Sequence, residues 1–288
     1  MSWDFDLLTI RAEDHAGGQA LWATIDAPPM NVMTPKLFWE LEAFSGQVEA
    51  DDDVVAVVLE SADPDFFIAH FDVSGILKFP VEGQAERTGE LSTFHVMCER
   101  FRTMSKATIV KIAGRVGGGG AELSASCDMR FGALDQMVLN QMEVPLGILP
   151  GGTGTQHIPR LVGRGRAMEI ILGAIDIDAR TAEQWGWLNR ALPADQLDDH
   201  VDNLARRIAS FPAHALGAAK AAVLAAGPDP VPGMLDEAYF FQTTLRDPRT
   251  QASMQAFLDL GGQTRDAELE MEDLSGRISG VVAGTDEN

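Results

Sequence analysis

The chain has 288 residues, of which 45% are hydrophobic and 23% are charged, and its formal net charge is −21. This length and composition allow a real hydrophobic core, in one large domain or in one domain with an appendage. A nucleic-acid-binding protein needs a basic face, and no basic stretch is present, so we expect no nucleic-acid partner. The acidic surface also disfavours binding to anionic membranes.

Targeting and redox signals are sparse. No run of about 18 apolar residues is present, so we expect no membrane insertion. The acidic N-terminus lacks the pattern of a signal peptide, and we expect a cytoplasmic protein. Cys98 and Cys127 form no disulfide framework and suit a reducing compartment. His95 and Cys98 would supply only two ligands, so no metal site is expected.

The N-terminal half alternates between strand and helix patterns. Thr34 and Pro35 predict a helix start, as N-cap and first helical residue, and apolar residues follow at helical spacing. The alternation of strands and helices predicts an α/β architecture. The predicted strands are 7–12, 20–26, 54–60, 109–113 and 137–140, and a further helix is predicted at 119–127.

From about Pro150 onward the pattern is mainly helical. We expect a core at 1–204, a helical region at 205–260 and an acidic, loosely packed tail at 261–288. The apolar helices of 205–260 could pack across subunits, or they could simply close the core of their own chain. The predicted helices are 154–162, 164–173, 179–186, 194–210, 213–226, 233–246 and 248–260, with a short strand near 188–192.

The most informative segment is 109–128, in which an apolar strand runs into a glycine-rich turn and then a helix. Glycines let the backbone approach a ligand closely, and the first N–H groups of a helix are free to bind an anion or an oxyanion. The segment lacks the Lys-Ser/Thr of a phosphate loop and the spacing of a dinucleotide fingerprint. Glu122 lies in the first helical turn, where the helix dipole alone favours an acid, although a simple helix start needs no run of four glycines.

Two further segments carry candidate residues. In 66–72, the apolar residues are expected in the core, and His70 is by default a structural histidine. In 139–156, Glu143 lies between a short strand and a loop rich in proline and glycine. Apolar neighbours would raise its pKa and suit it to general acid catalysis, whereas the alternative is a solvated loop glutamate.

These three segments, in this order and at these separations, resemble the crotonase (enoyl-CoA hydratase/isomerase) superfamily. The motifs lie at 67–72, 113–128 and 142–156, and the resemblance extends over about residues 5–260. It implies a spiral of repeated β-β-α units with a C-terminal helical region, and a homotrimer or homohexamer. It also implies an acyl-CoA substrate and no cofactor, because coenzyme A is part of that substrate.

The resemblance assigns roles to particular residues. The backbone N–H groups of Phe71 and Gly119 would form an oxyanion hole for the thioester oxygen. Glu122 would activate a water molecule, and Glu143 would exchange a proton with the α-carbon. The other residues expected at the substrate are Ala69, His70, Asp72, Gly118, Gly120 and Gly151.

Some residues depart from the family pattern. His70 replaces the usual glycine, and Phe71 replaces the usual small residue, so the acyl pocket is expected to be narrowed or reshaped. The usual basic residue after the first strand is absent. Lys78, Arg115 or a neighbouring subunit would therefore have to contact the CoA phosphates. Residues 78–95 are expected to form a loop that helps to set the acyl-chain specificity.

The expected function is hydration of a 2-enoyl-CoA to a 3-hydroxyacyl-CoA, a reaction of fatty acid metabolism, because both family glutamates are present. One alternative is an enoyl-CoA isomerase, which needs one acid/base group and no held water. Another is a CoA-thioester hydrolase or decarboxylase that uses the same oxyanion hole. The last alternative is a non-catalytic acyl-CoA-binding protein. The departure from the family pattern at His70 and Phe71 leaves this alternative open.

Overall fold

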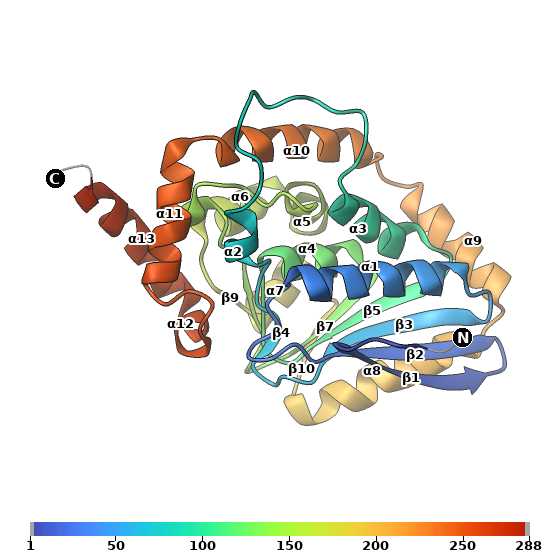
Figure 1. Ribbon diagram of the computed structural model, residues 1–288. Coiled ribbons are helices and arrows are strands. Elements are labelled where there is room, and N and C mark those ends of the chain that lie inside the picture. Colours follow the sequence, from blue (N-terminus) through green and yellow to red (C-terminus); the bar gives the residue numbers. More distant parts are fainter. Residues whose placement is uncertain (1–2, 286–288) are drawn as a thin grey trace.

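The computed structural model in Figure 1 describes residues 3–285, so the first two residues of the acidic N-terminus and the last three of the acidic tail lie outside it. The strands form two sheets, in line with the predicted α/β class. The larger sheet has the order β1 (Leu8–His15), β2 (Gly18–Ile25), β3 (Val54–Ser61), β5 (Ala107–Ile112), β7 (Met129–Ala133) and β10 (Arg190–Leu192). The smaller sheet has the order β4 (Phe66–Ile68), β6 (Arg115–Gly117), β8 (Val138–Asn140) and β9 (Ile177–Asp178).

The two sheets are built by a repeated unit. β3, β5 and β7 are parallel neighbours in the larger sheet, and each is followed along the chain by a strand of the smaller sheet, β4, β6 or β8. A helical segment then leads on from each of these short strands. The helical segments are α2 (Val73–Ile76) with α3 (Thr93–Thr103), α4 (Gly118–Ser126), and the 3-10 turn η1 (Val144–Leu146).

Helices cover both faces of the larger sheet (Figure 1). On one face lie α1 (Pro35–Ala50), α3 and α4, and on the other lies α8 (Ala194–Ala209). From Ala56 to Leu59, successive side chains of β3 alternate between two apolar clusters: Val57 and Leu59 belong to one cluster, and Ala56 and Val58 to the other. A strand buried on both faces reads as a continuous apolar run.

The predicted start of α1 is confirmed. The Thr34 side chain accepts a hydrogen bond from the Leu37 N–H at 3.3 Å, and Pro35 is the first helical residue. The apolar stripe of this helix is buried against the larger sheet at Leu37, Leu41, Phe44 and Val48.

Most predicted helices of the second half are confirmed. The ranges 154–162 and 164–173 agree to the residue with α5 (Gly154–Val162) and α6 (Arg164–Gly173). The others are α7 (Ala179–Trp185), α9 (Ala213–Leu224), α10 (Val231–Leu245) and α11 (Pro248–Asp259), together with α8. None of the helices within residues 3–285 is long and apolar enough to cross a membrane.

The acidic tail differs from its prediction. Over its described part it is not loosely packed but forms α12 (Arg265–Leu269) and α13 (Met271–Thr285), at the side of the molecule beside α11 (Figure 1). Met271, Leu274 and Ile278 recur at helical spacing and are buried in one cluster with Met142 and Phe257. In the sequence, the many acidic residues of this segment make the helical spacing of its few apolar residues hard to recognise.

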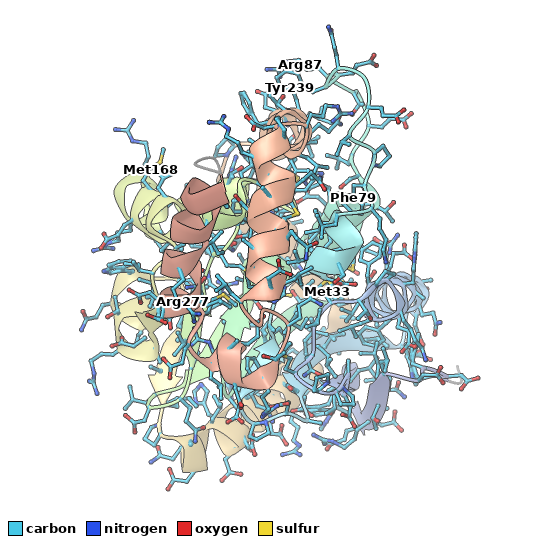
Figure 2. The ribbon with its side chains drawn as sticks, turned by 60° about the vertical axis from the view of Figure 1, so that its left-hand side comes forward. Met33, Phe79, Arg87, Met168, Tyr239 and Arg277 are labelled. Atoms are coloured by element: carbon cyan, nitrogen blue, oxygen red, sulfur yellow. The ribbon has the colours of Figure 1, made fainter. Side chains whose placement is uncertain are left out.

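The segment 78–95 is a loop only up to Ser92, because α3 begins at Thr93. The loop rises over α10 (Figure 1). Its Arg87 forms an ion pair with Asp236 and lies over the ring of Tyr239, 4.5 Å from the ring centroid. Figure 2 shows Arg87 and Tyr239 together at the top of the molecule, and Tyr239 lies near the middle of α10. The loop and α10 therefore form one edge of the molecule.

Candidate active site

A cavity of about 350 Å³ lies between α1, α3, α4 and α10. Its wall is mostly apolar, with a few polar side chains at its inner end and rim. The apolar side chains are Phe38, Phe71, Ile76, Phe79, Phe94, Ile148, Leu149 and Phe241. The polar ones are Ser92, Thr93, His95, Glu122, Glu143 and Gln242. Small-molecule sites usually combine a mostly apolar cavity with a few polar groups.

Five of the residues predicted at the site line this cavity together, although they come from distant parts of the chain: Phe71, Gly119, Glu122, Glu143 and Gly151. The remaining predicted residues are not part of the lining: Ala69, His70, Asp72, Gly118 and Gly120. His70 and Asp72 flank Phe71 in the sequence, Gly118 and Gly120 flank Gly119, and Ala69 lines a separate void. Their direct contact with a substrate stays a prediction.

The four glycines from Gly117 to Gly120 allow a close approach between the start of α4 and the turn at 68–71. A Cβ on Gly117 would lie 2.4 Å from the carbonyl oxygen of Ala69, and one on Gly120 would lie 2.6 Å from Ile68. Gly118 also has a positive φ of 44°. The glycine run is thus required by packing, and it brings the N-terminus of α4 against the turn that carries Phe71.

The backbone around Phe71 has a defined orientation. The Met33 N–H donates to the carbonyl of His70 at 2.8 Å, and the Asp72 N–H donates to the carbonyl of Met33 at 3.2 Å. The peptide between His70 and Phe71 is trans, so its N–H points opposite to its carbonyl, away from Met33.

Gly119 is the second residue of α4, where a helical N–H has no partner within the helix. Among the described residues, no acceptor is found for the N–H of Phe71 or of Gly119. The two residues are neighbours in space, since a Cβ on Gly119 would lie 3.5 Å from the Cβ of Phe71. Two unpaired donors thus lie at one part of the cavity wall.

Glu122 is buried and held by backbone amides. Its Oε1 accepts hydrogen bonds from the N–H groups of Gly152 and Gly154, both at 2.8 Å. Burial, followed by the charges of Glu143 and Glu237, raises the pKa of Glu122 well above its ordinary value, although the two amides oppose this shift. The protonated form of this carboxyl group is therefore favoured more than that of an exposed glutamate.

Glu143 is also buried, directly before η1. With its amide nitrogen facing the carboxylate, Gln141 donates to both oxygens of Glu143, at 2.8 and 3.1 Å. Burial raises the pKa of Glu143 to about 7; Glu237 adds to this shift and His70 opposes it. Carboxyl groups with such pKa values are suited to general acid–base chemistry.

Glu237, a third buried carboxylate, was not predicted from the sequence. It extends from α10, and its Oε1 accepts from the Thr153 N–H at 2.8 Å and from His95 Nε2 at 3.0 Å. Its Oε2 accepts from the Thr155 N–H at 2.9 Å. These amides lie at the positive end of α5, which stabilises negative charge. Because Glu237 carries no local motif, no sequence signal could have placed it here.

The side chain of Phe71 belongs to an aromatic cluster. Its ring centroid lies 6.1 Å from that of Phe94, 6.3 Å from Phe38 and 6.4 Å from Phe79. Phe38 and Phe94 stack nearly parallel at 5.8 Å. Phe71 thus forms part of the apolar wall of the cavity, and the reshaping expected from its size stays a prediction.

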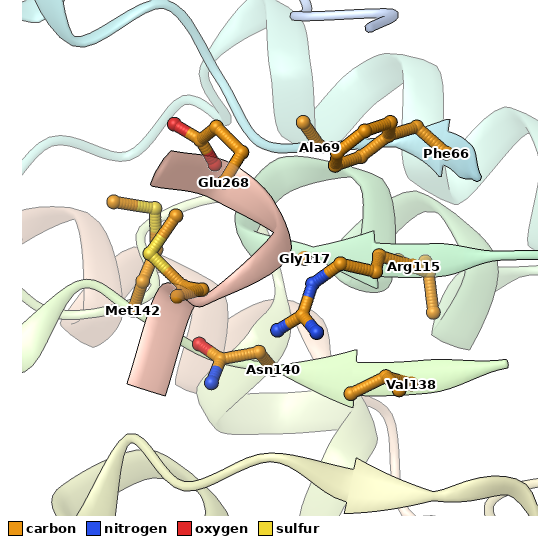
Figure 3. A pocket seen from close by; sticks show the side chains of 10 residues that line it. Phe66, Ala69, Arg115, Gly117, Val138, Asn140, Met142 and Glu268 are labelled. Carbon is orange, nitrogen blue, oxygen red and sulfur yellow. The ribbon is translucent and has the colours of Figure 1, made fainter. Parts of the chain in front are cut away.

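Arg115, one of the candidates for a contact with the CoA phosphates, does not line the cavity. Its guanidinium binds both oxygens of Asp176, at 2.6 and 2.7 Å, and it lines a different, water-sized void. Figure 3 shows this void beside the smaller sheet, with Arg115, Asn140 and Glu268 around it. Lys78 is exposed and directly precedes Phe79 of the cavity wall, so it remains a candidate.

Comparison with known proteins identifies the family. The sequence model of the enoyl-CoA hydratase/isomerase family matches residues 19–264, and the chain belongs to this family. It is 32% identical over 195 residues to the short-chain-enoyl-CoA hydratase of Clostridium acetobutylicum, covering 67% of this chain and 73% of that protein.

Solved structures confirm the crotonase fold that the motifs predicted. A candidate enoyl-CoA hydratase from Streptomyces avermitilis is 36% identical and superimposes with a TM-score of 0.84, over 96% of this chain and 99% of the other. An enoyl-CoA hydratase from Bacillus anthracis is 25% identical, with a TM-score of 0.68 over 88% and 96% of the two chains.

Proposed function

We propose that the protein adds water to a 2-enoyl-CoA to form a 3-hydroxyacyl-CoA. The observation that carries this proposal is that Glu122 and Glu143 line one cavity beside the unpaired N–H groups of Phe71 and Gly119. Such a site offers two proton-transfer groups and an oxyanion hole to the same substrate. The proposal is supported by the hydratases among the relatives.

The proposed reaction begins with a water molecule between the two carboxyl groups. Glu122 takes a proton from the water, whose oxygen forms a bond to C3 of the enoyl group. The electron pair of the double bond moves onto the thioester oxygen, and Glu143 then delivers a proton to C2. Net water is added, and the pair regains its starting state when the proton gained by Glu122 is passed on to Glu143. One ionised and one protonated carboxyl are needed, and the charge of Glu143, which raises the pKa of Glu122, favours a pair that holds one proton.

The developing negative charge on the thioester oxygen is held by the two N–H groups. Such preorganised donors act strongly in a cavity that excludes water, and losing one typically costs about 100- to 1,000-fold in rate. Only backbone atoms are required, so the large side chain of Phe71 is compatible with this role. Coenzyme A enters as part of the substrate, and the proposed steps use no further cofactor.

The test is a panel of 2-enoyl-CoAs of increasing chain length, followed by loss of the conjugated thioester absorbance. The wild type should consume at least one member, and Glu122→Gln should lower its kcat by about 100- to 10,000-fold. Glu169→Gln, at an exposed glutamate of α6, is the matched control and should keep full activity.

Two outcomes would contradict hydration. Migration of the double bond of 3-enoyl-CoAs without any water addition would indicate an isomerase. Tight binding of acyl-CoAs with no turnover of any member would indicate a binding protein.

A further inference from the structure

The turn that carries Phe71 contains a buried histidine with both ring nitrogens engaged. His70 Nδ1 lies 2.7 Å from the carbonyl oxygen of Phe71, and Nε2 lies 2.8 Å from Oε1 of Glu268. The carbonyl can only accept, so Nδ1 carries a hydrogen. Oε1 of Glu268, which faces Nε2, also accepts the Gln263 N–H at 2.8 Å. The ring therefore lies between two oxygen acceptors, an arrangement that favours its protonated form.

The partner of His70 comes from the far end of the chain. Residues 263–268, which we call the C-terminal clamp, lie against the turn at 70–74. Gln263 accepts the Val73 N–H through Oε1 at 2.8 Å and donates through Nε2 to Asp72 Oδ1 at 3.0 Å. Glu268 reaches His70 from α12, and Figure 3 places it beside Ala69. The clamp thus forms hydrogen bonds with His70, which precedes Phe71, and with Asp72 and Val73, which follow it.

The two peptides that flank Phe71 are consequently held from two directions. Met33 binds the carbonyl of His70 and the N–H of Asp72 on one side. The His70 ring binds the carbonyl of Phe71 on the other side. This leaves the N–H of Phe71 as the unpaired polar group of this backbone segment, directed away from Met33.

The His70–Glu268 pair is almost fully shielded from solvent, with side-chain exposures of 2% and 1%. Burial disfavours the imidazolium, but the Glu268 carboxylate and the bond to the Phe71 carbonyl outweigh it and raise the pKa of His70. Glu143, on the turn before η1, is the other acid whose charge acts on His70. Breaking one partner of such a pair is costly, so the arrangement resists displacement.

We propose that His70, tied to Glu268, is a positioning residue that fixes the Phe71 peptide so that its N–H faces the thioester oxygen. The proposal rests on the proposed function, since it concerns the same oxyanion hole. It also assigns a task to the C-terminal clamp, none of whose residues lines the cavity.

The test uses two substitutions of similar size that keep different donors. In His70→Asn the amide can replace Nδ1 and still donate to the Phe71 carbonyl, whereas in His70→Gln it can replace Nε2 and reach only Glu268. Both lose the imidazole ring. Glu270→Ala, at an exposed position just after the clamp, serves as the control.

The readout is the ratio of the Kd for S-hexyl-CoA to that for hexanoyl-CoA. The thioether lacks the carbonyl oxygen, so this ratio reports the oxyanion hole without requiring turnover. We expect the wild type, Glu270→Ala and His70→Asn to prefer the thioester, and His70→Gln to lose about 10-fold or more of that preference. The kcat of His70→Gln should fall by about 100-fold or less with little change in KM, as expected for a transition-state interaction.

The outcomes separate the two proposals. If the wild type does not bind the thioester more tightly than the thioether, the predicted oxyanion hole is contradicted, and so is the proposed function. A wild type that prefers the thioester, together with equal preferences in His70→Asn and His70→Gln, would leave the function standing and overturn the positioning role. S-hexyl-CoA binding by each variant verifies that its cavity is folded.

Discussion

Glu122 and Glu237 bind alternate amides of the same turn at the start of α5. Gly152 and Gly154 donate to Glu122, whereas Thr153 and Thr155 donate to Glu237. One helix N-terminus therefore supports two buried carboxylates, and the charge of each acts on the other. Since Glu237 raises the pKa of Glu122, the protonation of the proposed base depends on a residue from α10.

Removing the charge of Glu237 should make Glu122 a stronger acid. We expect Glu237→Gln to lower the pKa of Glu122 and to shift the low-pH limb of kcat/KM for hydration to lower pH. Its loss of charge-assisted hydrogen bonds should also cost roughly 1–3 kcal/mol of stability. The pH profile of kcat/KM and the unfolding free energy measure the two effects, and an unshifted low-pH limb would contradict the coupling.

The proposed acid should limit hydration at high pH. Glu143 must be protonated to deliver a proton to C2, and its pKa is about 7, so hydration should decline as the pH rises through about 7. Hydration neither consumes nor releases a proton, so its equilibrium constant does not depend on pH, and kcat/KM for dehydration should decline in parallel with that for hydration. The pH profiles of kcat/KM for the wild type and for the residual activity of Glu143→Gln check this. An unchanged high-pH decline in Glu143→Gln would speak against Glu143 as the proton donor.

The same group links stability to pH. A carboxyl with a folded-state pKa of about 7 binds its proton more tightly than the unfolded chain does. This contribution is fully present below the unfolded-state pKa and is lost as the pH rises through about 7, a change on the order of 2–3 kcal/mol. Denaturant unfolding at pH 5 and pH 8 should show a smaller pH dependence for Glu143→Gln than for the wild type and Glu169→Gln.

The side chain and the backbone of Phe71 should have separable effects. Phe71→Ala removes a ring from the aromatic wall but keeps the N–H, so we expect a loss of about 1–3 kcal/mol of stability and weaker binding of short acyl groups. The preference for hexanoyl-CoA over S-hexyl-CoA should persist. If this preference vanished instead, the ring rather than the amide would be recognising the thioester.

The sequence predicted the long elements well and the short ones poorly. α5 and α6 follow clear helical spacing between glycines, so even their ends were predicted. β4 and β6 have three residues each, too few to establish a period, and were not predicted. α3 was not predicted, and its first three residues fell within the predicted loop 78–95, because its apolar residues are interrupted by charged ones that bind other elements, such as Glu99 and Arg100.

The same limit applies to the site. Glu122 and Glu143 stand in motifs whose spacing carries information, and the structure places both in the cavity. Glu237 and Glu268 stand in helices without any motif, and only the tertiary fold brings them to Thr153 and His70. His70 was expected to be a structural histidine, and its burial and double hydrogen bonding agree with that default while giving it a specific partner.

The hydrogen bonds between residues 263–268 and the turn at 70–74 have a consequence for biosynthesis. A nascent chain can assemble its N-terminal strands while the ribosome is still adding the last helices. It cannot complete the surroundings of Phe71 until residue 268 has left the exit tunnel. A premature stop near residue 260 should therefore yield a chain that retains both sheets but has little activity.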